Sequence, residues 1–259
     1  MKRSFVVSSL IVFVMSLVFS TVAMAEAPKV TGSASVDFMS NYVWRGIKLS
    51  KDFVIQPSVT VSYSGFSMNM WSNLDTNYYL REITGRKFKS TETDITLNYT
   101  HSFDKLSLTG GFIYYALESA SDTQELYISA SYDVLLKPTL TFYYDIKEGK
   151  GGYLTASIGH SFDLAKDVPL NLGAAVGYNM KNKVMSYEAY TGKNFNNFYN
   201  AELSASVSVP VTKQISITPK VAYSFALSND SKTAISAMDV SGKDKKNIFY
   251  GGLNLSFNF

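Results

Sequence analysis

Hydrophobic and polar residues alternate along most of the chain after about residue 30. At the C-terminus, polar residues separate four apolar ones, Leu253, Leu255, Phe257 and Phe259. Successive side chains of a β-strand point to opposite faces, so this segment predicts a strand with one apolar and one polar face. The alternation recurs at 54–63, 93–103 and 199–209, and further strands are expected to begin near 31, 66, 106, 124, 138, 153, 169 and 215. The pattern therefore predicts about twelve strands, within a range of 10–14.

The connections between these segments alternate in length. Short ones follow the even-numbered strands, at 64–65, 104–105, 134–137, 163–168 and 209–214. Longer ones follow the odd-numbered strands, at 46–53, 76–91, 117–123, 147–152, 180–197 and 228–246. No linker or change of composition interrupts the series, so we expect one domain over residues 26–259.

Two architectures produce alternating strands. In a soluble β-sandwich the apolar face meets a second sheet, and the connections need not alternate in length. In a transmembrane barrel every strand must be paired, because lipid cannot satisfy the polar groups of an open edge. Single-chain bacterial barrels have an even number of strands, short turns at one end and longer loops at the other. The sequence therefore favours an all-β fold, a closed antiparallel transmembrane β-barrel.

The first 25 residues have the features of a secretory signal peptide. Lys2 and Arg3 precede an apolar stretch that runs from Phe5 to about Val22, and Ala23-Met24-Ala25 matches a cleavage site. The alternative is an uncleaved anchor, which the serines at 8, 9, 16 and 20 disfavour. We expect cleavage after Ala25 and export to the outer membrane of a Gram-negative cell envelope.

Composition excludes several classes of protein. The chain has no Cys and two His, so neither a disulfide scaffold nor a Cys- or His-rich metal centre is expected. Loss of the leader lowers the net charge from +3 to +1, which gives no reason to expect nucleic acid. We predict no metal, no other cofactor and no catalytic residue.

Aromatic residues make up 14% of the chain and cluster near predicted strand ends. Transmembrane barrels carry such rings at both membrane interfaces. The girdle expected at the loop end contains Tyr42, Trp44, Tyr114, Tyr144, Tyr178, Tyr199, Tyr223, Phe225 and Phe249. The girdle expected at the turn end contains Tyr63, Phe66, Tyr99, Phe103, Tyr132, Phe162, Phe257 and Phe259.

Two segments resemble known families. The C-terminal alternation of Leu253, Leu255, Phe257 and Phe259 resembles the signature by which the barrel assembly machinery recognises bacterial outer-membrane barrels. In the first third, two short motifs contain Asn41, Tyr42, Trp44, Arg45, Gly46, Trp71, Ser72 and Asn73. They are similar to motifs of the TorF-type (Gcw-chp) porin family, with the MipA/OmpV barrels as near relatives, although the second motif here lacks one intervening residue. The resemblance implies an outer-membrane location and porin-like activity.

Charged residues are expected on the inward face of the barrel. The candidates for the lumen and its mouth are Asp37, Arg45, Asp75, Asp94, Glu125, Asp145, Glu202 and Lys220. Rings of acidic side chains favour cations in pores, whereas paired charges would plug the barrel. Arg45 has two interpretations: it pairs with a carboxylate or attracts anions in the lumen, or it satisfies loop carbonyls beside a special turn at Gly46. We favour the structural role.

A His-Ser-Phe-Asp tetrapeptide occurs twice, at 101–104 and 160–163. A Ser-His-Asp hydrolase needs its Ser and His within hydrogen-bond reach. Adjacent residues of a strand face opposite ways, so the repeat more simply marks two equivalent turns.

The predicted function is passive passage of small hydrophilic solutes through a narrow polar lumen. The alternative is a non-conducting barrel that serves as an envelope scaffold or binds a partner. The expected partners are outer-membrane lipid, lipopolysaccharide near the basic outer loops, the barrel assembly machinery and small polar solutes.

Overall fold

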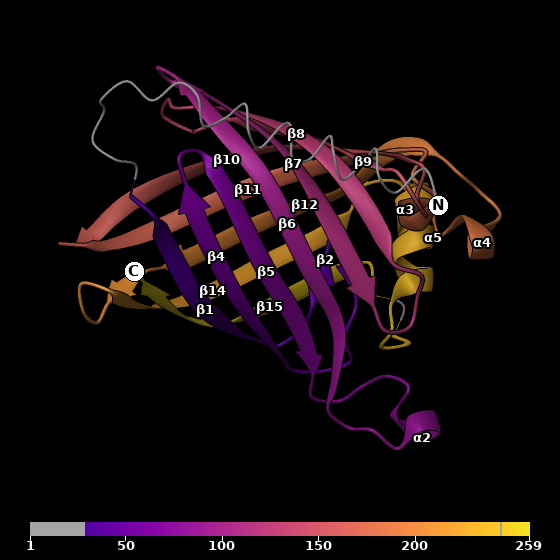
Figure 1. The fold of residues 1–259 in the computed structure, drawn as a ribbon. Coiled ribbons are helices and arrows are strands. Elements are labelled where there is room, and N and C mark those ends of the chain that lie inside the picture. The colour runs from indigo at the N-terminus through magenta and orange to yellow at the C-terminus, as the bar shows by residue number, and fades with distance from the viewer. Residues whose placement is uncertain (1–28, 244) are drawn as a thin grey trace, which may run out of the picture. The chain divides into compact units, whose positions relative to one another are not determined.

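The alternating segments form long antiparallel strands, and these strands make up a closed barrel (Figure 1). The described residues contain twelve long strands: β1 (Thr31–Met39), β4 (Val54–Tyr63), β5 (Phe66–Asp75), β6 (Lys89–Phe103), β7 (Leu106–Leu117), β8 (Thr123–Tyr132), β9 (Thr139–Asp145), β10 (Gly151–Ala165), β11 (Val168–Met180), β12 (Asn196–Val207), β14 (Ile215–Ala226) and β15 (Asn247–Asn258). The predicted number of strands is confirmed.

Pairing between the first and last strands closes the barrel. β1 pairs with β15 from Ser33 opposite Asn258 to Met39 opposite Gly252, and every other long strand pairs with its neighbours in the chain. The short β13 (Val209–Pro210) continues β12 along β14. The prediction of a closed antiparallel barrel is confirmed.

The computed structural model describes residues 29–243 and 245–259. The barrel, residues 31–259, is one unit. The predicted signal peptide lies outside the described residues, so its cleavage after Ala25 stays a prediction. Within the described ranges, no helix combines the length and apolar character needed to cross a membrane.

Short and long connections lie at opposite ends of the barrel, which we call the turn end and the loop end. The turn end has the connections 64–65, 104–105, 133–138, 166–167 and 208–214. The loop end has the connections 40–53, 76–88, 118–122, 146–150, 181–195 and 227–246. They contain the small strands β2 (Val43–Trp44) and β3 (Ile47–Lys48) and the helices α2 (Arg81–Thr84), α3 (Lys183–Ser186), α4 (Glu188–Thr191) and α5 (Asn229–Met238).

The two-residue turn 64–65 shows how the sequence forms this end. Ser64 and Gly65 both have positive φ, 50° and 85°, as two-residue hairpin turns require. A Cβ atom on Gly65 would lie 2.7 Å from the carbonyl oxygen of Thr100. Glycine is therefore needed at position 65 both for its backbone angle and for the close approach of β6.

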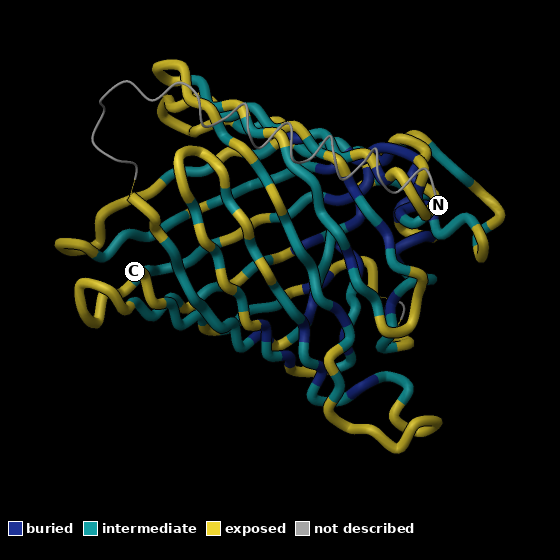
Figure 2. The backbone as a smooth tube through the Cα atoms, in the orientation of Figure 1, coloured by how far each residue is buried: buried dark blue, intermediate teal, exposed yellow. Residues whose placement is uncertain are grey.

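The two faces of the wall differ in chemistry. Large apolar side chains are exposed on the outside, for example Met70, Ile128 and Leu203 at 53%, 60% and 54%. Inside, small polar side chains hydrogen-bond across strands, as in the pairs Asn69–Ser58, Thr100–Thr109 and Ser129–Thr141, all at 2.8 Å. Figure 2 shows that exposed residues recur along the strands, while buried residues gather at the loop end.

The aromatic girdles are only partly as predicted. All eight residues expected at the turn end are exposed. At the loop end Tyr144, Tyr223 and Phe249 are exposed, and Tyr114, Tyr178 and Phe225 are half-buried.

Three members of the predicted loop-end girdle were placed wrongly, because they lie inside. β1 ends at Met39, and the chain then turns inward with Tyr42 and Trp44. A bulge where β12 faces Val176 and Tyr178 of β11 places Tyr199 inside, with no exposed surface.

Candidate functional site: the narrowed lumen

The segment between β1 and β4 folds into the barrel. Its β2–β3 hairpin buries Ile47, which belongs to one apolar cluster with Met185 of α3, Tyr199 of β12 and Ile235 of α5. Gly46 has φ of 82°, and a Cβ atom there would lie 2.9 Å from the Cβ of Asn200. The hairpin therefore fits tightly against β12 and narrows the lumen.

Arg45, at the tip of this hairpin, reaches across the barrel. Its Nη1 and Nη2 atoms donate to the two carboxylate oxygens of Glu125 on β8, at 2.8 and 2.7 Å. The guanidinium carbon lies 4.6, 4.5 and 4.4 Å from the ring centroids of Trp44, Tyr143 and Tyr153. Since β8, β9 and β10 lie opposite β1 in strand order, one side chain links the two sides of the barrel.

The ion pair is well shielded from solvent. The side chains of Arg45 and Glu125 are 9% and 2% exposed, and the Tyr115 hydroxyl donates a further bond of 2.8 Å to Glu125. Burial alone would lower the pKa of Arg45, but the Glu125 carboxylate raises it above its ordinary value. Arg45 thus remains charged. The structure shows the carboxylate pairing that was one of the two interpretations of this residue, and its guanidinium bonds are to Glu125 rather than to loop carbonyls.

The two segments of the family resemblance meet in the lumen. The Tyr42 ring lies 5.3 Å from that of Trp71, and both belong to a second apolar cluster with Met39 and Val54. Asn73 accepts from Gln56 at 3.0 Å and donates to Thr91 at 2.8 Å.

The remaining motif residues have more local contacts. Ser72 donates to the backbone oxygen of Glu92 at 2.7 Å. Asn41 donates to the hydroxyl of its neighbour Ser40, at 3.2 Å. Of these motif residues, Tyr42 and Trp71 join the inserted segment to β5, whereas Ser72 and Asn73 bond neighbouring strands within the wall.

The other predicted lumen charges also face inward, in different settings. Asp37 pairs with Lys220 at 2.7 Å and accepts from Asn254 at 2.9 Å. Asp145 accepts from the Thr123 hydroxyl at 2.8 Å. Glu202 accepts from the Tyr250 hydroxyl at 2.8 Å. No cation pairs with Asp145 or Glu202 within the described part of the chain.

Two carboxylates are incompletely satisfied. One oxygen each of Asp75 and Asp94 is buried without a hydrogen-bond partner among the described residues. Two of the eight predicted charges are basic and both are paired, so Asp75, Asp94, Asp145 and Glu202 are the acids without a paired cation among the described residues. The wall of the loop-end half is therefore acidic.

Sequence reasoning missed a further acid and the covering helices. Glu92, 8% exposed, lies on the same wall near Asp94. Within α5, Ala234 and Ile235 are completely buried, and Ser228 caps the helix by accepting from the Ser231 backbone. A Ser directly before a segment whose apolar residues have helical spacing is a signal from which this helix could have been predicted.

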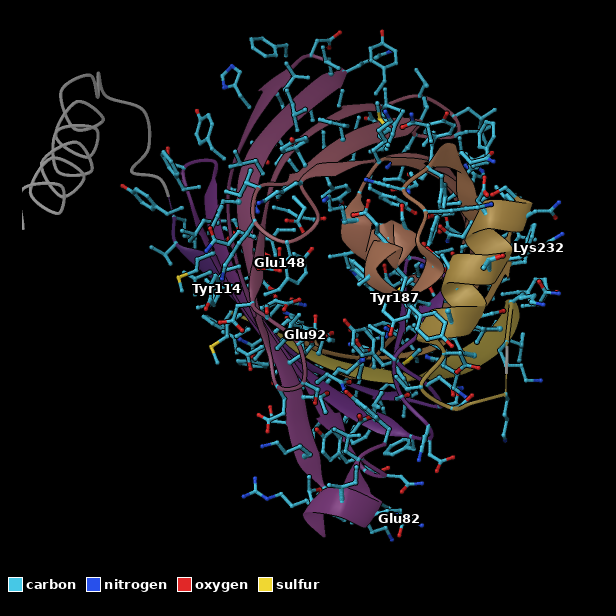
Figure 3. All side chains as sticks on the ribbon, turned by 90° about the vertical axis from the view of Figure 1, so that its right-hand side faces the viewer. Glu82, Glu92, Tyr114, Glu148, Tyr187 and Lys232 are labelled. Atoms are coloured by element: carbon cyan, nitrogen blue, oxygen red, sulfur yellow. The ribbon has the colours of Figure 1, made fainter. Side chains whose placement is uncertain are left out.

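Among the described residues, hollows lie on both sides of the hairpin. One at the loop end has a volume of about 650 Å³ and includes Tyr42, Trp44 and Glu92 in its lining. The other, at the turn end, has about 500 Å³ and is lined mainly by polar residues such as Ser33, Thr60 and Ser62. Figure 3 looks at the loop end, where Glu92, Glu148 and Tyr187 surround one opening.

The repeated tetrapeptides do not form a hydrolase site. His101 lies edge-on to Phe103, with ring centroids 4.4 Å apart, and His160 lies in the same way against Phe162 at 4.6 Å. Ser102 instead bonds Ser107 across the turn at 2.9 Å. Both segments precede turns at the turn end, as the alternation predicts.

The C-terminal signature lies on the outer face of β15. Leu253, Phe257 and Phe259 are 37%, 40% and 54% exposed, and Leu255 is half-buried. These residues lie beside β1, at the seam that closes the barrel.

The fold defines a transmembrane β-barrel of the outer-membrane type, with an apolar outside and a lumen that polar side chains line. Solved porins share it. The chain is similar to the NanC porin, with 13% identity and a TM-score of 0.55 over 87% of this chain and 98% of that chain. It is also similar to the KdgM porin in complex with disordered oligogalacturonate, with 12% identity and a TM-score of 0.54 over 88% and 99%.

These likenesses establish the fold. No protein-family model matches the chain, and no curated protein matches its sequence. Both structures are named as porins.

Proposed function

We propose that the protein is an outer-membrane channel for the passive passage of small hydrophilic solutes, with the β2–β3 hairpin as its narrowest part. This proposal rests on the arrangement of the lumen. Hollows at the two ends are separated by the hairpin that Arg45 ties to Glu125. The likeness in fold to porins supports the proposal.

The charge of the wall indicates the selectivity of this channel. The four acids without a paired cation, Asp75, Asp94, Asp145 and Glu202, outnumber the basic groups facing the same space, both of which are paired. Acidic rings favour cations in pores. The channel should therefore prefer small cations over small anions.

A second candidate is a non-conducting barrel that acts as a scaffold or binds an envelope partner. The observation that favours it is the packing of the inserted segment. Ile47, Met185, Tyr199 and Ile235 form a dry apolar cluster, all at 1% exposure or less. A core of this kind resists water and could seal the barrel permanently.

Single-channel conductance of the folded protein in planar bilayers separates these candidates. Discrete conductance steps with a reversal potential that shows cation preference support the channel. A flat trace from protein whose gel migration shifts on heating, the sign of a folded barrel, would reject the channel and leave the sealed scaffold.

The remaining assignments extend the same proposal. We infer that the chain is exported, cleaved after Ala25 and inserted in the outer membrane, which N-terminal sequencing of membrane fractions tests. Relationship to the TorF-type family is supported by the contact between Tyr42 and Trp71 of its two motifs. The exposed C-terminal residues are proposed for recognition by the barrel assembly machinery, and deletion of Phe259 should slow membrane assembly.

Lipopolysaccharide remains a proposed contact of the outer loops. Several basic residues of these loops have an acidic partner, as in Lys183–Glu188 at 3.1 Å and Arg81–Glu82 at 2.8 Å. Such pairing weakens the attraction of the loops for lipopolysaccharide phosphates. Catalysis is not part of the proposal, because His101 and His160 pack against phenylalanine rings.

A further inference from the structure

The hollow at the loop end has the size and lining of a small-molecule site. Its volume of about 650 Å³ lies within the range of roughly 300–1,000 Å³ typical of ligand pockets. Five aromatic residues contribute to its wall, Tyr42, Trp44, Tyr79, Tyr115 and Tyr187. Aliphatic side chains, among them Leu117 and Val240, fill much of the rest. Such a wall binds a ligand with an apolar or aromatic body.

The charge in this hollow is negative. Its charged lining residues are Glu92, Glu148, Glu188 and Lys183. Lys183 pairs with Glu188 at 3.1 Å, and the nearby Arg45 is already paired with Glu125. Glu92 and Glu148 face the same opening from β6 and from the loop before β10, and neither has an ion-pair partner among the described residues (Figure 3).

Of the two carboxylates, Glu92 gives the stronger indication of a bound cation. It is 8% exposed, and a buried carboxylate is costly unless a cation or several donors compensate it. Burial, and after it the charges of Glu92 and Asp94, raise the pKa of Tyr42 well above its ordinary value. Glu92 and Asp94 therefore place two carboxyl groups close together in a poorly hydrated place, where a bound cation would compensate them.

We propose that this hollow binds a small organic cation, an ammonium group on an apolar or aromatic body. The ammonium would lie between Glu92 and Glu148, and the body would contact the tyrosine and tryptophan rings, whose faces attract cations. A small inorganic cation would leave the apolar walls uncovered. No group of three or more potential metal ligands exists in the described part of the chain.

The proposal goes beyond channel activity and does not depend on it. The site lies on the loop-end side of the hairpin, so it would exist in a conducting barrel and in a sealed barrel alike. Binding without conductance would support the site and reject the channel, and conductance without binding would do the reverse.

Tryptophan fluorescence gives a direct test. The chain has two Trp, and the Trp71→Phe variant leaves Trp44, which lines the hollow, as the single emitter. The folded barrel in detergent is titrated with benzyltrimethylammonium, benzyl alcohol and benzenesulfonate, and calorimetry gives the stoichiometry. The cation should bind one per barrel, at least about tenfold more tightly than the sulfonate, because carboxylates attract its positive charge and the faces of aromatic rings bind quaternary ammonium groups.

Glutamine variants test the role of each carboxylate. Glu92→Gln and Glu148→Gln each remove a carboxylate charge, so each should weaken binding of the cation about three- to tenfold and leave that of benzyl alcohol unchanged. Glu82→Gln, on the outlying α2, is the matched control and should have no effect. If gel migration shows that Glu92→Gln does not fold, the affinity of Glu148→Gln, which lies on the exposed loop, tests the proposal instead. Equal affinity for the cation and the sulfonate, or cation binding that neither variant weakens, overturns the proposal.

Discussion

The buried ion pair between Arg45 and Glu125 predicts strong coupling between the two residues. Removing one partner leaves an uncompensated charge at a place where the side chains are 9% and 2% exposed. Loss of one member of a buried pair typically costs about 3–5 kcal/mol, whereas replacing both is much milder. We therefore expect Arg45→Met and Glu125→Gln each to destabilise the protein by about 3 kcal/mol, and the double variant to recover about 2–3 kcal/mol of their sum.

A double-mutant cycle measures this coupling. The free energy of unfolding of all four proteins is obtained from urea titrations of the barrel in lipid vesicles, followed by tryptophan fluorescence, where Trp44 reports on the hairpin itself. The control is Glu118→Gln, which breaks the pair that Lys89 forms with Glu118 at 2.7 Å. Those side chains are 18% and 43% exposed, so its loss should cost no more than about 1 kcal/mol.

Additivity would refute the reasoning. If the effects of Arg45→Met and Glu125→Gln add within about 0.5 kcal/mol, the pair is not an energetically coupled link across the lumen. The same variants test the position of the constriction. Arg45→Met should raise single-channel conductance, and unchanged conductance despite strong coupling would place the narrowest part elsewhere.

Three further predictions concern the lumen. The Tyr199 hydroxyl is buried with no partner among the described residues, so Tyr199→Phe should leave the free energy of unfolding unchanged or raise it. By contrast, Tyr153→Phe removes a 2.7 Å hydrogen bond to Asn200 and should lower the free energy of unfolding by about 1 kcal/mol. Gly46→Ala should lower stability by about 1–3 kcal/mol in the same urea assay, because alanine is strained at a φ of 82°. Asp94→Asn and Glu202→Gln should reduce cation preference, and unchanged reversal potentials would contradict the acidic-wall hypothesis.

Local alternation was enough to predict the wall of the barrel. In β15 the apolar positions Leu253 and Phe257 face out and Asn254 faces in, where it bonds Asp37. The same rule assigns Glu125, Asp145 and Glu202 to the inner face, where they bond Arg45, Thr123 and Tyr250, because a strand alternates its side chains regardless of distant contacts.

The contents of the barrel could not be predicted in this way. Alternation continued past Met39 suggested that Tyr42 and Trp44 belong to the outer girdle, yet the chain leaves β1 there and turns inward. At Tyr199 a single bulge in β12 reverses the expected face. Neither event has a local periodic signal, since both depend on the space that the other strands enclose.

The sequence by itself determined the number of strands, their order, the two ends and the chemistry of the two faces. These properties follow from neighbouring residues and from the need to pair every strand in lipid. Only the tertiary structure decided that the first loop enters the lumen and that Arg45 meets Glu125, 80 residues further along the chain. That contact exists because barrel closure brings β8 opposite β1, and the low exposure inside makes the two charges stable only as a pair.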